Sequence, residues 1–382
     1  MLSKFEVRGF KGFRDTFVFD LTQKNEYKFN AEAVSNGVIR NSIVYGRNGC
    51  GKTNLSYALF DIVNNVGGKS IRSKFFNKNY LNAGSVDRKA VFCYTFKFGD
   101  DELVYSYEKE SSAKILKETV VVNGRMCIVA DRSRPASIIV DLPGADTLNK
   151  DVDDLFDISG AAVSIVSYIR SNTILPDVGE SAVFNKFVKF VHGMLLVRSL
   201  EGNSFVGLNE SEKNVCEDIV ENGNIEDFEG FLNKNGIKCK LVEISDNDGK
   251  NIAFDFDGNL IPFAEIASTG TRTLCLFYFW LMRIREAERI SLVCIDEFDA
   301  FYHHELSLAV VELLKHSGIQ VILTTHNTAI MSNDVLRADC YFIMDETRIV
   351  SLADTTDKEI RQAHNLEKIY KAGGFSLERK GE

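Results

Sequence analysis

Apolar and polar residues alternate along two short N-terminal segments, residues 5–8 and 16–21. A period of two is typical of β-strands, so this region is predicted to form a β-hairpin. The same pattern predicts three more strands, at residues 90–98, 103–108 and 117–122. The last of these ends at an Asn-Gly pair, which favours a tight turn. Together these segments predict an antiparallel sheet in the N-terminal part of the chain.

The pattern becomes helical over residues 154–235, where apolar residues recur with the spacing of an α-helix. No heptad repeat is sustained there, which argues against a long coiled coil. Strands are predicted again at residues 238–244 and 252–256, and β and α segments then alternate to the C-terminus, as in a parallel α/β sheet. The apolar run at residues 274–282 is too short to cross a bilayer and is predicted to be a buried helix.

Residues 46–53 match the phosphate-binding pattern G-x-x-x-x-G-K-T. They follow a strand-like run and precede a segment whose apolar residues have helical spacing. A strand, a glycine-rich loop and a helix N-terminus together form an anion site, because backbone N–H groups and the helix dipole face the phosphates. Cys50 occupies one of the variable positions of the pattern. The residues predicted to bind nucleotide here are Gly46, Asn48, Gly49, Gly51, Lys52, Thr53 and Asn54.

Two later apolar runs end in polar residues, one in Asp296 and Glu297, the other in His326. Hydrolysis of a nucleoside triphosphate needs an acid to hold Mg²⁺ and a base to orient the attacking water. Asp296 is therefore predicted to bind the metal together with Thr53, and Glu297 is predicted to be the base. His326 is predicted to contact the terminal phosphate, because ligands collect at the carboxyl ends of parallel strands.

Ser268 and Gly270 stand directly before the apolar run that is predicted to be a helix. Serine is a favoured N-cap, and glycine allows close approach of the backbone, so this helix start is predicted to be a second phosphate-binding element. Serine-x-glycine is common at helix starts. The element becomes specific through its place between the phosphate loop and the Asp-Glu pair.

Composition narrows the class of protein. The chain has 382 residues, 45% of them hydrophobic, which suits a globular protein with a sizeable core. The net charge of −9 argues against general attraction to nucleic acid, although a local basic patch is not excluded. Eight scattered cysteines without a C-x-x-C pair predict neither a disulfide framework nor a metal cluster. No signal peptide or membrane-spanning run is visible, so the expected location is the cytoplasm.

The order of these elements resembles the ATP-binding-cassette (ABC) heads of SMC, RecF and overcoming-lysogenization-defect proteins, over residues 1–66 and about 250–350. Residues 8–14, R-G-F-K-G-F-R, are similar to the N-F-[RK]-[GS]-F element of RecF-like and SMC-like chains. Residues 296–306 and 366–375 are similar to D-E-[IL]-[DE]-x-x-L-H-P-x-L and L-E-x-x-Y-x-x-G-x-F elements of bacterial stand-alone ATPases of the AAA family. That group includes abortive-infection proteins and the antiphage ATPases PtuA and AriA.

The resemblance implies an α/β fold: an ABC-ATPase head with a mixed or parallel P-loop sheet, an antiparallel β-subdomain and a helical insertion. The expected division is an N-terminal lobe with the phosphate loop and the antiparallel strands at residues 1–125, a mainly helical insertion at residues 126–240, and a C-terminal lobe at residues 241–382 that carries the signature, the Asp-Glu strand and the switch histidine. It also implies ATP and Mg²⁺ as cofactors. Two copies would sandwich ATP, with the phosphate loop of one facing Ser268 and Gly270 of the other. His326 would then match the switch histidine of such heads, and Asp299 would match their interface aspartate.

Departures from the family pattern are informative. Thr271 and Arg272 replace the glycine and glutamine of the transporter-type signature. No glutamine occurs between residues 24 and 319, so the loop glutamine that helps to hold Mg²⁺ in such heads is missing. Either another residue replaces it, or hydrolysis is slow and gated. Of His303 and His304, only the second matches the L-H-P element, and both are interpreted as structural.

The function implied is that of an ATP-hydrolysing subunit of a bacterial antiviral defence system. Such a homodimer or higher homo-oligomer would sense infection or control a separate effector, such as a nuclease or toxin. The alternative is an SMC-like or RecF-like DNA-repair ATPase, which the acidic charge and the absence of heptads disfavour. A transporter subunit is disfavoured by the missing glutamine and by the N-terminal element. A nuclease within residues 67–250 is also open, but the candidates Glu118, Asp146 and Asp151 have no recognisable spacing.

Overall fold

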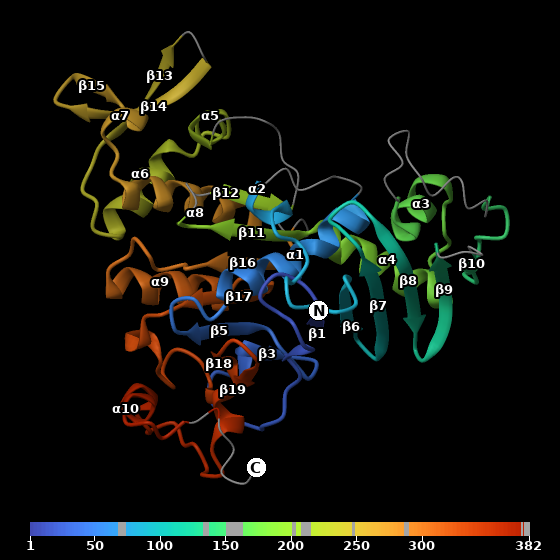
Figure 1. Ribbon diagram of the computed structural model, residues 1–382. Helices are drawn as coiled ribbons and strands as arrows, with labels where there is room; N and C mark the ends of the chain where they lie inside the picture. The colour runs from blue at the N-terminus through green and yellow to red at the C-terminus, as the bar shows by residue number, and fades with distance from the viewer. Residues whose placement is uncertain are drawn as a thin grey trace.

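A computed structural model describes residues 1–67, 74–132, 137–149, 163–200, 204–207, 215–246, 249–285, 290–375 and 377. Within them the architecture is α/β, with two large sheets on either side of the helix that follows the phosphate loop (Figure 1). The predicted α/β fold class is therefore confirmed. Among the described residues, every helix is too short or too polar to cross a lipid bilayer.

The central sheet contains the phosphate loop. Its strands, as far as the chain is described, are β5 (Asn41–Gly46), β11 (Met194–Arg198), β12 (Ser204–Gly207), β16 (Leu292–Asp296), β17 (Gln320–Thr325), β18 (Tyr341–Met344) and β19 (Ile349–Ser351). They are ordered β12-β11-β16-β17-β5-β18-β19. The five inner strands are parallel, and the two edge strands pair antiparallel. Strands β5, β11, β16, β17 and β18 are buried at every position, as expected for a sheet that is covered on both faces.

The second large sheet is antiparallel throughout. Its described strands, in spatial order, are β10 (Ser137–Val140), β9 (Arg125–Asp131), β8 (Ile115–Val122), β7 (Asp101–Lys109), β6 (Ala90–Phe98), β1 (Leu2–Arg8) and β2 (Phe17–Asp20). The predicted hairpin and the three predicted strands are confirmed. Buried and half-buried residues alternate along β6 and β7, so one face packs on the core and the other faces outward.

The helices connect and cover these sheets. They are α1 (Lys52–Gly67), α2 (Lys74–Asn77), α3 (Ile165–Asn172), α4 (Gly179–His192), α5 (Val215–Glu221), α6 (Ile225–Lys234), α7 (Phe263–Ile266), α8 (Thr269–Arg285), α9 (His304–Lys315) and α10 (Leu366–Lys371). Helix α8 confirms the predicted buried helix. A small sheet of β13 (Leu241–Asp246), β14 (Gly249–Phe256) and β15 (Asn259–Pro262) projects beside α7 (Figure 1). The short pair β3 (Val34–Ser35) and β4 (Val38–Ile39) precedes β5.

The prediction of a helical pattern over residues 154–235 needs correction. Helices α3 to α6 lie there, but β11 and β12 interrupt them, and β11 is an inner strand of the central sheet. A strand buried on both faces is a continuous apolar run, and over five residues such a run looks like one face of a helix. The division at residues 125 and 240 stays a prediction, although residue 125 begins β9 inside the antiparallel sheet.

A buried polar cluster joins the phosphate-loop helix to the antiparallel sheet. Asp61 of α1 accepts hydrogen bonds from Tyr80 and from Tyr107 of β7, each 2.9 Å long, and pairs with Lys109 of β7 at 2.9 Å. Tyr94 of β6 donates to the carbonyl oxygen of Ala58 at 2.7 Å. These side chains are buried, so each hydrogen bond satisfies a group that would otherwise be costly to bury. The cluster fixes α1 against the second sheet.

Candidate nucleotide site

The phosphate loop joins β5 to α1, as the sequence predicts. Gly49 and Gly51 have φ angles of +85° and +103°, which residues with a Cβ rarely adopt. Gly46 is required for another reason: a Cβ there would collide with the sulfur of Cys50 and lie 2.9 Å from the carbonyl oxygen of Met344. Cys50 is buried, so it is part of the packing of the loop rather than an arbitrary residue at a variable position.

Lys52, Glu297 and His326 lie in a row across the carboxyl edge of the central sheet. Lys52 Nζ donates to the carbonyl oxygen of Gly46 at 2.8 Å and lies 3.2 Å from one carboxylate oxygen of Glu297. The other oxygen of Glu297 lies 3.1 Å from Nδ1 of His326. The side chains of Lys52 and Glu297 are 4% and 13% exposed, whereas that of His326 is 59% exposed. The carboxylate therefore sits between a buried lysine and a histidine at the surface.

Thr53 and Asp296 form the second half of the edge. The hydroxyl of Thr53 donates to one oxygen of Asp296 at 2.8 Å, and the hydroxyl of Thr324 donates to the other at 2.7 Å. Burial raises the pKa of Asp296, and the negative charge of Glu297 adds to the rise. The two hydroxyl groups and the positive charge of Arg198 act in the opposite direction.

The donor set at Thr53 and Asp296 fits Mg²⁺. A hydroxyl and a carboxylate in contact offer oxygen ligands, which this hard cation prefers. Among the described residues there is no group of three or more His, Cys, Asp or Glu side chains able to hold a metal. Magnesium in nucleotide sites commonly takes only one or two protein ligands and completes its shell with phosphate and water oxygens. Thr53 and Asp296 supply that number.

Thr324 was not predicted as a site residue, yet it contacts both acidic residues, the carboxylate of Asp296 and the backbone of Glu297. Its hydroxyl donates to Asp296 and accepts from the backbone N–H of Glu297 at 2.9 Å. Glu297 has a φ of +50°, a left-handed conformation that costs a non-glycine residue on the order of 1 kcal/mol. The hydrogen bond to Thr324 helps to hold this turn. The two threonines directly before His326 are the feature of the sequence that could have indicated this role of Thr324.

Asp299 lies in the turn after Glu297 and is buried. One of its oxygens accepts a hydrogen bond from the hydroxyl of Thr325 at 2.6 Å, and the same hydroxyl accepts from the backbone N–H of Asn327 at 2.9 Å. The predicted interface aspartate is therefore held inside its own chain. Among the described residues, its other oxygen has no hydrogen-bond partner.

Ser268 caps helix α8, as predicted. Its hydroxyl accepts from the backbone N–H of Thr271 at 3.1 Å, and its carbonyl oxygen accepts from the N–H of Arg272 at 2.9 Å. A Cβ on Gly270 would lie 3.2 Å from the carbonyl oxygen of Phe301, so this glycine permits a close approach of the backbones. Within the described part of the chain, no hydrogen bond or ion pair joins Ser268 or Gly270 to the phosphate loop. The structure thus brings the loop to Asp296, Glu297 and His326, but not to the predicted signature.

Two other residues predicted to bind nucleotide, Asn48 and Asn54, lie in different surroundings. Asn48 is exposed at the tip of the phosphate loop. Asn54 packs against the N-terminal turn, where a Cβ on Gly12 would lie 3.1 Å from its side-chain nitrogen. The conspicuous N-terminal R-G-F-K-G-F-R segment therefore contacts the first turn of α1.

Several other polar residues have structural roles. Nδ1 of His303 accepts from the N–H of Leu306 at 3.2 Å and caps α9. The amide of Gln320 bridges the backbones of Leu2 and Ile39, so this glutamine does not serve the nucleotide site.

Glu118 is buried and accepts four hydrogen bonds, from Tyr105, Arg132, Ser164 and the N–H of Ile165. Its oxygens are thus occupied. Asp146 is exposed, and Asp151 lies outside the described residues.

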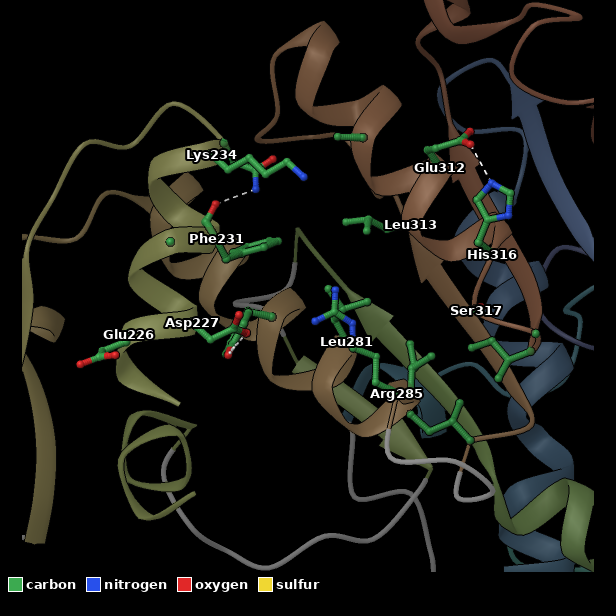
Figure 2. A pocket seen from close by; sticks show the side chains of 18 residues that line it. Glu226, Asp227, Phe231, Lys234, Leu281, Arg285, Glu312, Leu313, His316 and Ser317 are labelled. Carbon is green, nitrogen blue, oxygen red and sulfur yellow. Dashed lines mark hydrogen bonds and ion pairs between the residues drawn. The ribbon is translucent and has the colours of Figure 1, made fainter. Parts of the chain in front are cut away.

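A cavity of about 1120 Å³ opens elsewhere, between α6, α8 and α9 (Figure 2). Apolar side chains such as Phe231, Leu281 and Leu313 line it. Two of its acidic side chains have partners: Asp227 accepts a hydrogen bond from Tyr278 at 2.7 Å, and Glu312 lies 2.8 Å from His316. None of the predicted site residues lines this cavity. It is separate from the nucleotide edge of the sheet.

One protein-family description matches part of this chain. Residues 167–332 match a family described as "AAA domain, putative AbiEii toxin, Type IV TA system". The match covers less than half of the chain; it includes Asp296, Glu297 and His326 but not the phosphate loop. A comparison with curated protein sequences found no match.

Three solved structures illustrate the similarity in fold. An SMC head bound to the C-terminal winged-helix domain of ScpA has 18% identity and a TM-score of 0.47, over 92% of this chain and 97% of that one. The SMC head from Thermotoga maritima has 17% identity and a TM-score of 0.41, over 92% and 98%. A nucleotide complex of RecF, a recombination mediator, has 13% identity and a TM-score of 0.40, over 92% and 98%.

Proposed function

We propose that the chain binds ATP with Mg²⁺ at the phosphate loop and hydrolyses it. The observation that carries the proposal is the meeting of Lys52 and Thr53 with Glu297 and Asp296, since these pairs come from distant parts of the sequence. Phosphoryl transfer to water depends on positioned charges, a metal site and a base, and this edge of the sheet supplies all three. Mg²⁺, held by Thr53 and Asp296, would neutralise charge on the phosphates.

The ion pair between Lys52 and Glu297 couples binding to catalysis in this proposal. Phosphate oxygens compete with the carboxylate for the buried ammonium group of Lys52. When they take over Lys52, one oxygen of Glu297 becomes available to orient a water. His326 contacts the other oxygen of Glu297 and is exposed, and in this proposal it also contacts the terminal phosphate. Glu297 would thus act as the general base, and His326 would give electrostatic assistance.

A homodimer completes the proposed site. Ser268 and Gly270 lie at the start of α8 and, among the described residues, have no hydrogen bond or ion pair with the phosphate loop of their own chain, and a helix N-terminus attracts phosphate. The second copy would place these residues against the phosphate loop of the first. Asp299 is buried, so it would influence the proposed site indirectly, through Thr325 and the turn that carries Glu297. Because both nucleotides lie between the copies, ATP binding would close the dimer and hydrolysis would release it.

A part in antiviral defence belongs to the proposal. It is supported by the likeness of residues 296–306 and 366–375 to elements of abortive-infection ATPases, and by the description of the matching family, which names a toxin of a toxin–antitoxin system. The closing dimer would hold or release a separate effector, such as a nuclease or toxin. Loss of protection against phage in cells carrying Lys52→Ala, with the neighbouring genes present, is the expected result.

The biochemical test compares wild type with Lys52→Ala and Glu297→Gln. Wild type should bind and hydrolyse ATP, and Lys52→Ala should bind none. Glu297→Gln should bind ATP but hydrolyse it roughly 100- to 10,000-fold more slowly, because the base is lost. With saturating ATP its mass should double in light scattering. An exposed control, Glu346→Gln, should behave as wild type. A monomeric Glu297→Gln protein with ATP bound would overturn the composite site, and rate stimulation by duplex DNA would favour the repair alternative.

A further inference from the structure

A buried arginine lies beside the metal-binding carboxylate of the proposed site. Strand β11 runs parallel to β16, and Arg198 at its end pairs in register with Asp296. The next residue, Ser199, donates its backbone N–H to the carbonyl oxygen of Asp296 at 3.3 Å. Parallel strands present their carboxyl ends at one edge of a sheet, which is where ligands bind in such folds. Arg198 is therefore at the same edge as Asp296 and Glu297.

The side chain of Arg198 is held over the phosphate-loop helix. Its guanidinium carbon lies 4.4 Å from the centre of the Tyr57 ring, and the residue is 5% exposed. Tyr57 is one turn beyond Thr53 in α1, so the two side chains share a face of this helix. Stacking on an aromatic ring fixes the plane of a guanidinium group. Arg198 thus lies near the metal end of the loop, with its donors in a defined plane.

Two other cationic side chains lie in the region of Arg198. Lys11 Nζ lies 5.4 Å from the centre of the same Tyr57 ring. Burial lowers the pKa of Lys11 to about 8, and the charge of Arg198 contributes to the fall. Lys52 is a third cation on this edge of the sheet. Like charges that are held close and partly desolvated favour the binding of an anion, because it relieves their repulsion.

We propose that Arg198 binds the terminal phosphate of the nucleotide from the β11 side, opposite Lys52 of the phosphate loop. The inference rests on the proposed ATPase function and assigns a new ligand to that site. A guanidinium group can donate two hydrogen bonds to one phosphate in a planar fork, which an ammonium group cannot reproduce. Because ADP lacks the terminal phosphate, Arg198 is a residue that distinguishes ATP from ADP.

The test measures the affinities of ADP and of a non-hydrolysable ATP analogue, both with Mg²⁺, by calorimetry. In Arg198→Met, the affinity for the analogue should fall between about 10- and 100-fold, the range for a lost hydrogen bond to a charged group. The affinity for ADP should stay within about twofold of wild type. Arg198→Lys keeps the charge but loses the fork, so it should show an intermediate loss. This second variant keeps the test valid if Arg198→Met folds poorly.

Arg283 offers a matched control. It is also buried, and its guanidinium carbon lies 3.4 Å from the ring centre of Phe279, but it pairs with Asp218 in another part of the chain. Arg283→Lys should leave the ratio of the two affinities unchanged. Equal changes for ADP and for the analogue in both Arg198 variants, or none, would show that Arg198 is structural, while the ATPase proposal stands. Failure of the wild type to bind either nucleotide would overturn both proposals.

Discussion

Thr53 and Asp296 are 243 positions apart in the sequence, and the hydroxyl of the first donates to the carboxylate of the second at 2.8 Å. Strands β5 and β16 do not pair directly, since β17 lies between them. The contact is made by the first turn of α1, which places Thr53 over the end of β16. The site is therefore built from a helix on one face of the sheet and a strand within it.

Thr53→Val is expected to abolish the effect of Mg²⁺ on nucleotide binding. Valine keeps the branched shape of threonine but removes the oxygen that the metal needs. Thr53→Ser retains the hydroxyl and should bind Mg²⁺–nucleotide much as wild type does. The measurement is the affinity for nucleotide with and without Mg²⁺. Equal dependence on Mg²⁺ in Thr53→Val and wild type would exclude Thr53 as a metal ligand.

Thr324→Val is expected to impair both stability and hydrolysis. The substitution removes two buried hydrogen bonds, to the Asp296 carboxylate and from the Glu297 N–H, and should lower the free energy of unfolding by about 1–3 kcal/mol. The turnover of ATP should fall further than stability alone explains, because the carboxylate of Asp296 and the turn that carries Glu297 each lose a hydrogen bond. Denaturant unfolding and initial rates measure the two effects. Thr324→Ser serves as the control, and a Thr324→Val protein with normal turnover would contradict the supporting role.

Lys109→Met is expected to destabilise the protein strongly. It leaves the buried carboxylate of Asp61 without its cationic partner, which should cost about 3–5 kcal/mol. Removing both charges in Lys109→Met/Asp61→Asn should recover part of the loss. Lys89→Met breaks a more exposed pair with Glu108, the neighbour of Lys109 in β7, and should cost at most about 1 kcal/mol. Denaturant unfolding measures all of these variants, and similar losses for Lys109→Met and Lys89→Met would show that the buried pair has no special weight.

Stability is expected to rise between about pH 8 and pH 10.5 through Lys11. Burial lowers its pKa in the folded protein to about 8 from an ordinary value of 10.5, so the unfolded chain binds more protons in this range. Its charge therefore opposes folding below about pH 8, and this cost disappears as the pH rises through the range. The difference in unfolding free energy between wild type and Lys11→Met, followed against pH, isolates the effect. A flat difference across the range would contradict it.

The sequence predicted most of the individual site elements. The glycine pattern of residues 46–53 predicted a loop that the φ angles of Gly49 and Gly51 confirm, because only glycine adopts those angles without strain. The apolar runs before Asp296 and His326 predicted strands, and both exist as β16 and β17. Serine at position 268 predicted a helix cap, which the hydrogen bond from Thr271 confirms. Each of these signals depends on neighbours within a few residues.

What only the tertiary structure decided is which of these elements meet. The strand order places β11 beside β16, and this brings Arg198 next to Asp296, although the run that forms β11 was predicted to be helical. The hydrogen bonds of Thr324 with Asp296 and Glu297, and the contact of Arg198 with Tyr57, likewise join distant segments. Local patterns record the conformation of a segment and the face it buries, but they carry no information on its neighbour in a sheet. That choice follows from packing the whole chain around one core.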